Sequence, residues 1–313
     1  MTQTNQPDFI YPADLNRDHK IDLVTYSEEI NAGPAVFLGN GDGTVKLLGN
    51  APLIYATPYI TVGDVDGDGI PDIVTAQNEG SITILHRNGD GTFVQTYLYQ
   101  PPDASQFIPG GLIVVDVNHD GVADIVFTNA FAGTRGYLYI LFGTGEGGFR
   151  GPSIYQMPPY PGPIAAGDFD GDGNIDLAIA NAGENGSVTL PDYSVILLLG
   201  AGDGTFITGA TIQMEGLYPA WLTVADFDGD GASDLAVQGL SGPPPVMIWG
   251  SKARTFAASA ISGSLTGDCL VAADFDGDGF PDLANTCNAA DILLNRGGRV
   301  FEKVYNLGAG LDL

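Results

Sequence analysis

The sequence predicts an all-β fold, a six-bladed β-propeller of four-stranded antiparallel blades. Two repeated features predict it: an aspartate ladder that occurs six times, and a Gly-rich turn that follows the ladders. The first aspartates of successive ladders are 50, 52, 52, 58 and 48 residues apart, so the repeat is close to fifty residues long. One sheet of this size cannot bury both of its faces alone, and repeats of this length therefore stack as blades.

The composition favours strands and turns. The 45 glycines and 20 prolines are too many for a helical protein of 313 residues, because glycine weakens helix interiors and proline breaks them. A hydrophobic fraction of 44% supplies a core and excludes disorder. The formal charge of −27 repels phosphate backbones, so no nucleic-acid partner is expected. No apolar run approaches the roughly 20 residues of a membrane helix, so no membrane insertion is expected.

Each ladder places Asp at positions one, five and nine of one short loop, and Asp or Asn at position three. Numbered one to six along the chain, the loops carry Asp14, Asn16, Asp18 and Asp22; Asp64, Asp66, Asp68 and Asp72; Asp116, Asn118, Asp120 and Asp124; Asp168, Asp170, Asp172 and Asp176; Asp226, Asp228, Asp230 and Asp234; and Asp274, Asp276, Asp278 and Asp282.

Short apolar stretches flank each loop and predict the strands. Residues 270–273 precede loop 6 and residues 283–284 follow it, which gives the first and second strands of a blade. A third strand is expected in each unit, for example at 195–199. The glycines of the turn at 202–206 then permit the positive φ of a hairpin, after which the fourth strand starts.

The predicted blades cover residues 9–50, 51–100, 101–155, 156–212, 213–261 and 262–306 of a single propeller domain, 1–313. The chain begins with a first strand and ends with a fourth strand, so no blade is shared between the termini. A linear β-solenoid is the alternative fold, but it needs shorter coils of near-uniform length. We expect a monomer.

The loops are predicted to bind calcium, with up to six Ca²⁺ ions and one per blade. Carboxylates at alternating positions converge on one point, and hard oxygen ligands in a flexible loop select Ca²⁺. The alternative is that Asp-Gly pairs only form tight turns, which does not explain four polar positions repeated six times. Loop 1 has Asn16 and, in place of the glycine at position six, His19. It is therefore expected to be the weakest or an empty site.

The units resemble FG-GAP or VCBS repeats, the calcium-binding blades of integrin alpha-subunit propellers and of many bacterial and fungal secreted proteins. The resemblance is carried by the ladder VAADFDGDGFPDL at 271–283 and the turn GAGDGTF at 200–206. It implies that calcium lies on one face of the disc and stabilises blades rather than performing chemistry. The best-known relatives have seven blades, whereas this chain has six repeats.

The two cysteines flank loop 6. If Ala273 opposes Leu283, the same register places Cys269 opposite Cys287, within disulfide reach. The alternative is two buried free thiols. A disulfide together with weak calcium sites indicates an extracellular or cell-surface location. The start of the chain carries no basic or apolar leader.

No catalytic constellation is found in the sequence, and we do not expect an enzyme. Of the three histidines, His19 and His119 fall inside loops, and His86 ends a third strand, where a plain surface role is expected. Paired carboxylates are also the signature of a glycosidase, but in these loops their expected role is ligation of calcium.

Binding is the remaining function. The connectors that lead into the first strands are rich in aromatic residues, which either form sugar or peptide pockets or pack blade against blade. The candidates are Tyr59, Phe107, Tyr160, Tyr218, Trp221 and Tyr193, the last in the longest insertion, 183–193. Two functions follow: a calcium-stabilised lectin-like or adhesion module with a carbohydrate or protein ligand, or a non-catalytic structural or docking domain of a larger secreted protein or enzyme.

Overall fold

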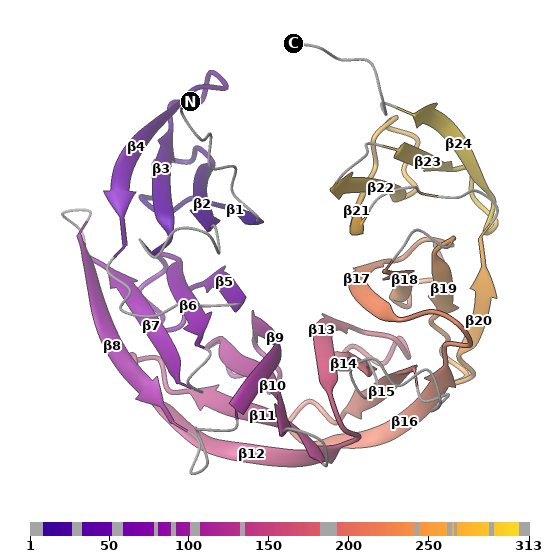
Figure 1. Cartoon of the computed structure of the whole chain (residues 1–313), viewed down its shortest axis with the longest axis horizontal. Coiled ribbons are helices and arrows are strands. Elements are labelled where there is room, and N and C mark those ends of the chain that lie inside the picture. Colours follow the sequence, from indigo (N-terminus) through magenta and orange to yellow (C-terminus); the bar gives the residue numbers. More distant parts are fainter. Residues whose placement is uncertain are drawn as a thin grey trace. The chain divides into compact units, whose positions relative to one another are not determined.

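The computed structural model describes residues 9–26, 33–51, 59–77, 81–88, 92–100, 107–131, 135–181, 193–240, 244–261, 265, 268–287 and 291–306. In these residues the regular structure is entirely β, in six sheets that each contain four strands (Figure 1). The fold is a six-bladed β-propeller, which confirms the predicted fold class. No helix among the described residues is long and apolar enough to cross a membrane.

The chain divides into two compact units, each described by itself. The first unit comprises Met1–Asp116 and Asp120–Met157. Its three blades are formed by β1 (Phe9–Ala13), β2 (Asp22–Tyr26), β3 (Ala35–Gly39) and β4 (Val45–Asn50); β5 (Tyr59–Gly63), β6 (Asp72–Ala76), β7 (Ile82–Arg87) and β8 (Phe93–Tyr99); and β9 (Phe107–Val115), β10 (Asp124–Phe131), β11 (Arg135–Gly143) and β12 (Phe149–Met157).

The second unit comprises Val117–His119 and Pro158–Leu313. Its three blades are formed by β13 (Pro161–Gly167), β14 (Asp176–Asn181), β15 (Ser194–Gly200) and β16 (Phe206–Gln213); β17 (Pro219–Ala225), β18 (Asp234–Gly239), β19 (Val246–Trp249) and β20 (Ala257–Ala260); and β21 (Asp268–Ala273), β22 (Asp282–Cys287), β23 (Asp291–Asn295) and β24 (Phe301–Asn306).

Each sheet consists of four consecutive, antiparallel strands in chain order. The first blade is therefore β1–β4 and the last is β21–β24, as the sequence predicts, and no described sheet combines strands from the two ends. Within the first unit, β5 packs beside both β1 and β9. Within the second unit, β17 packs beside both β13 and β21.

Burial is greatest on the second and third strands of the blades. Every residue of β6, β14, β15 and β18 is buried, because neighbouring sheets cover both faces of a central strand. Such strands read as continuous apolar runs and not as alternating ones. The fourth strands are more open, and five of the eight residues of β16 are exposed. The cores are local, and one of them packs Phe169, Leu197 and Leu235 between the first two blades of the second unit.

The register around loop 6 differs from the prediction by one residue. Ala273 pairs with Asp282 and not with Leu283, so Asp268, and not Cys269, stands opposite Cys287. The reason is that Asp282, the last residue of the loop motif, is already the first residue of its strand. Cys269 has a left-handed φ of 60°, which few non-glycine residues adopt. It is disulfide-bonded; the side chain of Cys287 lies outside the described residues.

Candidate metal centres

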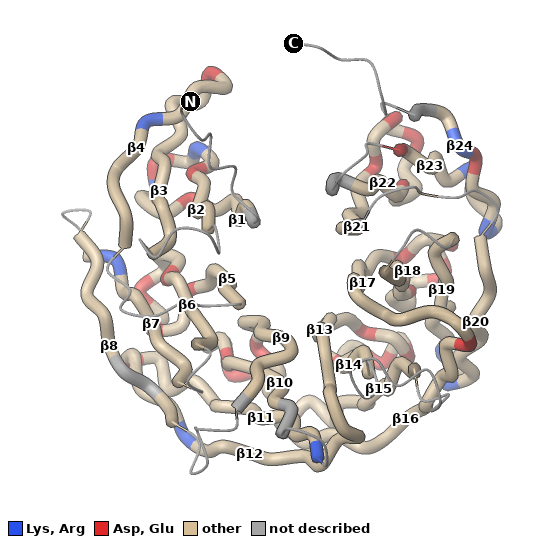
Figure 2. Tube along the Cα trace, viewed as in Figure 1, with Lys and Arg blue, Asp and Glu red and all other residues tan. Residues whose placement is uncertain are grey.

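Each aspartate ladder forms the loop between the first and second strands of its blade. The structure brings the four positions of each set into one short turn, and the six turns together hold all 24 predicted residues. Acidic residues accordingly recur in every blade (Figure 2). The aspartate at position nine is always the first residue of the second strand and is buried in each of the six blades.

The carboxylate at position one closes the loop. Its Oδ2 accepts the backbone N–H of position six in all six loops, at 2.7 to 3.0 Å. Position six needs a left-handed backbone, and five loops supply glycine there, as at Gly173 with φ 90°. In loop 1, His19 takes the same conformation with φ 62°. The loop backbone is therefore kept even where its glycine is not.

The aspartate at position nine ties the loop to the sheet. In loop 4, Oδ2 of Asp176 accepts the N–H of Phe169 at 2.8 Å, and Oδ1 accepts the N–H of Gly200, the last residue of β15, at 2.8 Å. Asp22 makes the corresponding pair of bonds in loop 1, with Leu15 and Gly39. Two aspartates of each loop thus hold backbone donors in place, which is the turn-forming role of these residues.

The carboxylates also converge. Groups of three acids with oxygens within 4.8 Å of one another occur in loops 2, 4, 5 and 6. They are Asp64, Asp66 and Asp68; Asp168, Asp170 and Asp176; Asp226, Asp228 and Asp230; and Asp274, Asp276 and Asp282. Loops 1 and 3 carry Asn16 and Asn118 at position three, so they bring fewer charges together.

Burial of these acids is unfavourable without a cation. Burial raises the pKa of Asp176 to about 6, with the charge of Asp170 adding to the effect and backbone N–H bonds opposing it. Burial likewise raises the pKa of Asp234 to about 7, with the charge of Asp228 adding. Since a nearby positive charge favours the ionised form, a bound cation would stabilise the ionised carboxylates of these two loops.

Arginines from the next blade reach loops 4 and 5. Arg254, in the turn after β19, places Nε 2.7 Å from Oδ2 of Asp170. Arg299, in the turn after β23, contacts Asp228 at 2.7 Å and lies 4.3 Å above the ring of Trp249. Each guanidinium therefore links the position-three aspartate of one blade to the following blade.

Sequence reasoning missed these two arginines, although a signal exists. Arg254 and Arg299 stand where the turns of the first four blades have Gly43, Gly91, Gly147 and Gly204. Both arginines keep the left-handed backbone of that position, with φ of 56° and 67°. An arginine at a position where the other repeats have glycine indicates that its side chain makes a contact outside the turn.

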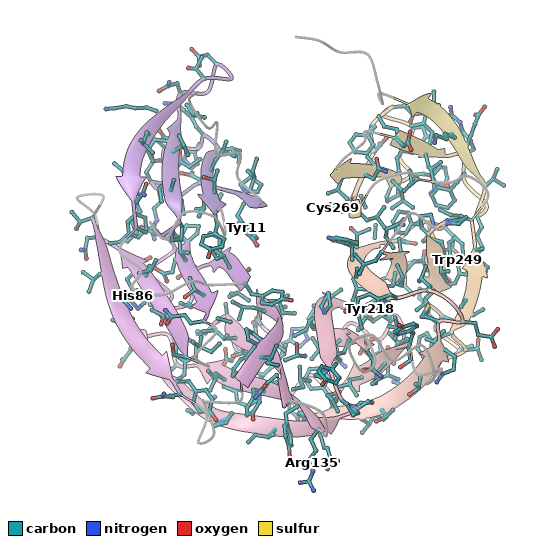
Figure 3. The ribbon with its side chains drawn as sticks, in the orientation of Figure 1. Tyr11, His86, Arg135, Tyr218, Trp249 and Cys269 are labelled. Carbon is teal, nitrogen blue, oxygen red and sulfur yellow. The ribbon has the colours of Figure 1, made fainter. Side chains whose placement is uncertain are left out.

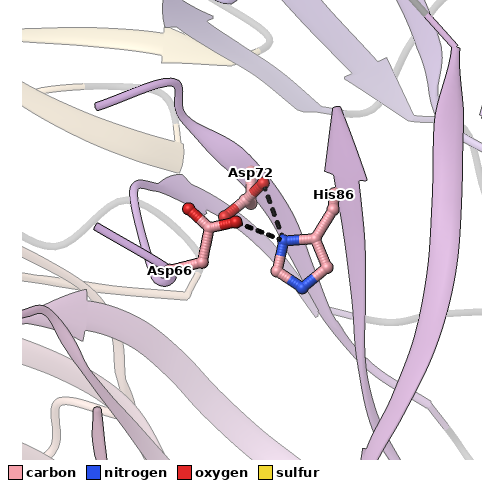
Figure 4. Close-up of side chains that lie close together, drawn as sticks. All are labelled: Asp66, Asp72 and His86. Atoms are coloured by element: carbon pink, nitrogen blue, oxygen red, sulfur yellow. Dashed lines mark ion pairs between the residues drawn. The ribbon is translucent and has the colours of Figure 1, made fainter. Parts of the chain in front are cut away.

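His86 does not have the plain surface role that the sequence suggested. Its side chain is 17% exposed, and its Nδ1 lies 3.3 Å from Oδ2 of Asp66 and 3.2 Å from Oδ1 of Asp72 (Figure 4). Contact with the Asp72 carboxylate raises the pKa of His86; burial opposes this, and the charges of Asp66 and Asp68 add to it. The imidazole is part of loop 2.

The connector aromatics whose side chains are described pack largely against the cores. Tyr59 packs on the core between the second and third blades, and Trp221 on the core between the fifth and sixth. Tyr218, which is labelled in Figure 3, meets Tyr193 edge to face with ring centroids 5.5 Å apart. Tyr160 is half-buried with φ 58°. The side chain of Phe107 and residues 183–192 of the insertion lie outside the described residues.

A family model for the FG-GAP-like repeat matches residues 14–75, 64–127, 168–237 and 226–284, and each match starts at position one of an aspartate loop. The chain is an FG-GAP repeat protein. The resemblance to FG-GAP repeats is thereby confirmed, and the matches span most of the two units.

Two curated relatives share part of this FG-GAP chain. Human cartilage acidic protein 1 is 29% identical over 182 residues, which are 56% of this chain and 27% of that protein. A T-cell immunomodulatory protein homolog of Plasmodium falciparum is 29% identical over 142 residues, 41% of this chain and 20% of that protein. The alignments thus span about a quarter of these relatives' length.

Solved structures share the fold at low identity. BBS1N, crystallised in complex with ARL6DN, has a TM-score of 0.62 at 14% identity, covering 96% of this chain and 82% of that one. Rhamnogalacturonan lyase YesW has a TM-score of 0.53 at 14% identity, covering 96% and 68%. At this identity the likeness concerns the fold alone.

Proposed function

We propose that this FG-GAP chain is a calcium-stabilised extracellular binding module, of the lectin-like or adhesion kind, and that it is not an enzyme. The observation that carries the proposal is the convergence of carboxylate oxygens in the loops. Opposite ligands of one Ca²⁺ lie about 4.6–5.2 Å apart, twice the usual Ca–O distance, and the acidic groups of loops 2, 4, 5 and 6 fall within 4.8 Å.

A buried oxygen in loop 4 supports the fit to calcium. Oδ2 of Asp170 is buried and has no hydrogen-bond partner among the described residues. The 2.7 Å contact from Arg254 Nε is an ion-pair contact without hydrogen-bond geometry. Asp168, Asp170, Asp172 and Asp176 would hold the ion, and Ca²⁺ would supply charge neutralisation and cross-linking of the loop.

The proposed role in stability is separable from ligand binding. The loops lie at the end of the first strand that is remote from the connector, so a metal there does not contact the aromatic candidates directly. We propose that calcium holds the blades and that the connector side presents the carbohydrate or protein ligand. An extracellular location is supported by the disulfide at Cys269, since disulfides persist in oxidising compartments.

A non-catalytic docking domain of a larger secreted protein is the second candidate. The packing of Tyr59 and Trp221 on the cores favours it, because side chains that fill a core leave less surface for a sugar pocket. The alignments with larger proteins, of which they cover about a quarter, also support it.

One experiment separates these candidates. Binding of the purified chain to a glycan array is measured in millimolar calcium and in EDTA, alongside thermal unfolding in both buffers. Calcium-dependent binding to a defined glycan class supports the lectin-like module. Calcium-dependent stability without glycan binding supports the docking domain, and an identical melting temperature in both buffers refutes the calcium proposal.

A further inference from the structure

Loop 2 differs from the other five loops because an imidazole enters it. His86 lies near the end of β7, and its Nδ1 is directed between Asp66 and Asp72 (Figure 4). In the other five blades, Oδ1 of the position-nine aspartate accepts a backbone N–H from the chain just at or after the end of the third strand. In this blade, Oδ1 of Asp72 faces the histidine at 3.2 Å.

The nitrogen is buried and aimed at the carboxylates. His86 Nδ1 has no solvent exposure and no hydrogen bond to any described residue, because its two close carboxylate contacts lack hydrogen-bond geometry. Asp72 is itself 2% exposed. Asp66, Asp72 and His86 each offer one possible ligand atom, and these three atoms lie within 4.8 Å of one another. Together they form a candidate metal-binding group.

The turn of the third blade covers this group. A side-chain carbon added at Gly147 would lie 3.5 Å from Asp66 Cβ and 3.8 Å from Nε2 of His86. The covering turn belongs to the same unit of the chain. Two blades therefore border the group, in which the His86 and Asp66 side chains are 17% and 24% exposed, and the imidazole stands where calcium would take an oxygen ligand.

We infer that loop 2 is a site for a borderline divalent cation of the zinc class, held by His86 Nδ1 and the carboxylates of Asp66 and Asp72. Imidazole nitrogen suits zinc, copper, iron and nickel, whereas calcium takes oxygen ligands. Two ligands of a tetrahedral zinc lie about 3.3 Å apart, given Zn–N and Zn–O distances near 2.0–2.1 Å. The N···O separations of 3.2 and 3.3 Å match this value.

This inference rests on the proposed function and refines it at one loop. The experiment therefore distinguishes failure of the zinc site from failure of calcium binding. Zinc binding to the full chain is titrated by calorimetry in millimolar calcium, which fills calcium sites first. We expect one zinc ion to bind, and His86→Asn to weaken it by at least about 10- to 100-fold, the effect of losing even an outer-shell partner. Cobalt substituted for zinc gives a visible absorption band that His86→Asn removes.

Two further variants complete the test. His19→Asn removes a histidine that is also in an aspartate loop but is 97% exposed and 4.0 Å from Asp14, and it should leave zinc binding unchanged. His86→Asp makes loop 2 all-oxygen and should lose zinc while keeping the calcium effect on stability. Unchanged zinc affinity in both His86 variants, or equal losses in the His19 variant, overturns the inference. If calcium does not stabilise the wild-type protein, the calcium proposal is refuted and the zinc inference is not.

Discussion

Loops 1 and 4 have the same backbone but different side-chain chemistry. In both, the position-one carboxylate accepts the N–H groups of positions five and six. In both, the position-nine aspartate accepts one N–H from position two and another from the end of the third strand. Loop 1, however, has Asn16 and His19 where loop 4 has Asp170 and Gly173. The comparison shows that the aspartates at positions one and nine hold the same backbone in both loops, whereas the charge at position three differs between Asn16 and Asp170.

The largest expected effect tests the backbone hydrogen bonds that loops 1 and 4 share. Asp176→Ala and Asp22→Ala each leave at least two buried N–H groups without their acceptor, and each unsatisfied group costs about 1–3 kcal/mol. We expect both variants to lose about 2–5 kcal/mol of unfolding free energy, by denaturant titration in EDTA. Similar losses support a common scaffold, whereas a small loss for Asp22→Ala alone would show that loop 1 is held differently.

Calcium binding tests the side-chain charge, in which loops 1 and 4 differ. A site with a dissociation constant of about 0.1 mM adds about 2.7 kcal/mol to the free energy of unfolding when the calcium concentration is about a hundred times that constant. Asp170→Ala should remove most of the increment from loop 4, while Asn16→Ala should remove little, because loop 1 has one carboxylate fewer. The measurement is the difference in unfolding free energy between calcium and EDTA for each variant. Equal losses of this difference would contradict the ranking.

The pH dependence of the metal-free protein follows from Asp176 and Asp234. Burial raises the pKa of these groups to about 6 and about 7, above the usual value near 3.8. The folded state therefore binds more protons than the unfolded state between pH 4 and about 7, and these groups make stability rise as pH falls through that window. Unfolding in EDTA, followed by hydrogen exchange in β14 and β18, should show this rise. Saturating calcium should reverse it, because protons then compete with the ion.

Arg254 tests whether loop 4 depends on its neighbour. Arg254→Gln leaves the side chain of Asp170, which is 0% exposed, without its partner. We expect a loss of about 1–2 kcal/mol in EDTA and a smaller loss in calcium, since the ion then neutralises the carboxylate. The matched variant in loop 1 is Lys20→Gln, whose pair with Asp18 is exposed and should change stability little. Equal effects of the two variants would show that Arg254, which contacts the preceding blade, contributes no more than Lys20, which contacts its own loop.

The sequence was sufficient to predict what depends on spacing. The six loops, the four strands of each blade and the position of each aspartate follow from a repeat of about fifty residues. Contacts between repeats could not be predicted, because Asp170 and Arg254 are 84 positions apart and only the stacking of blades brings them together. The same holds for His86, which lies near the turn in sequence but points back into loop 2. The cysteine register failed by one residue because the loop and its strand share Asp282.

The smallest expected effect concerns position six. His19 holds φ at 62° where Gly173 holds 90°, and a non-glycine residue in this region costs roughly 1 kcal/mol. His19→Gly should therefore stabilise the protein by up to about 1 kcal/mol, less the entropy that glycine adds to the unfolded chain. Gly173→His should destabilise it by a similar amount. Denaturant titrations in EDTA measure both, so that any difference in calcium binding does not contribute. If Gly173→His costs far more than His19→Gly gains, the two loops differ in backbone as well as in charge, and the separation of shape from chemistry fails.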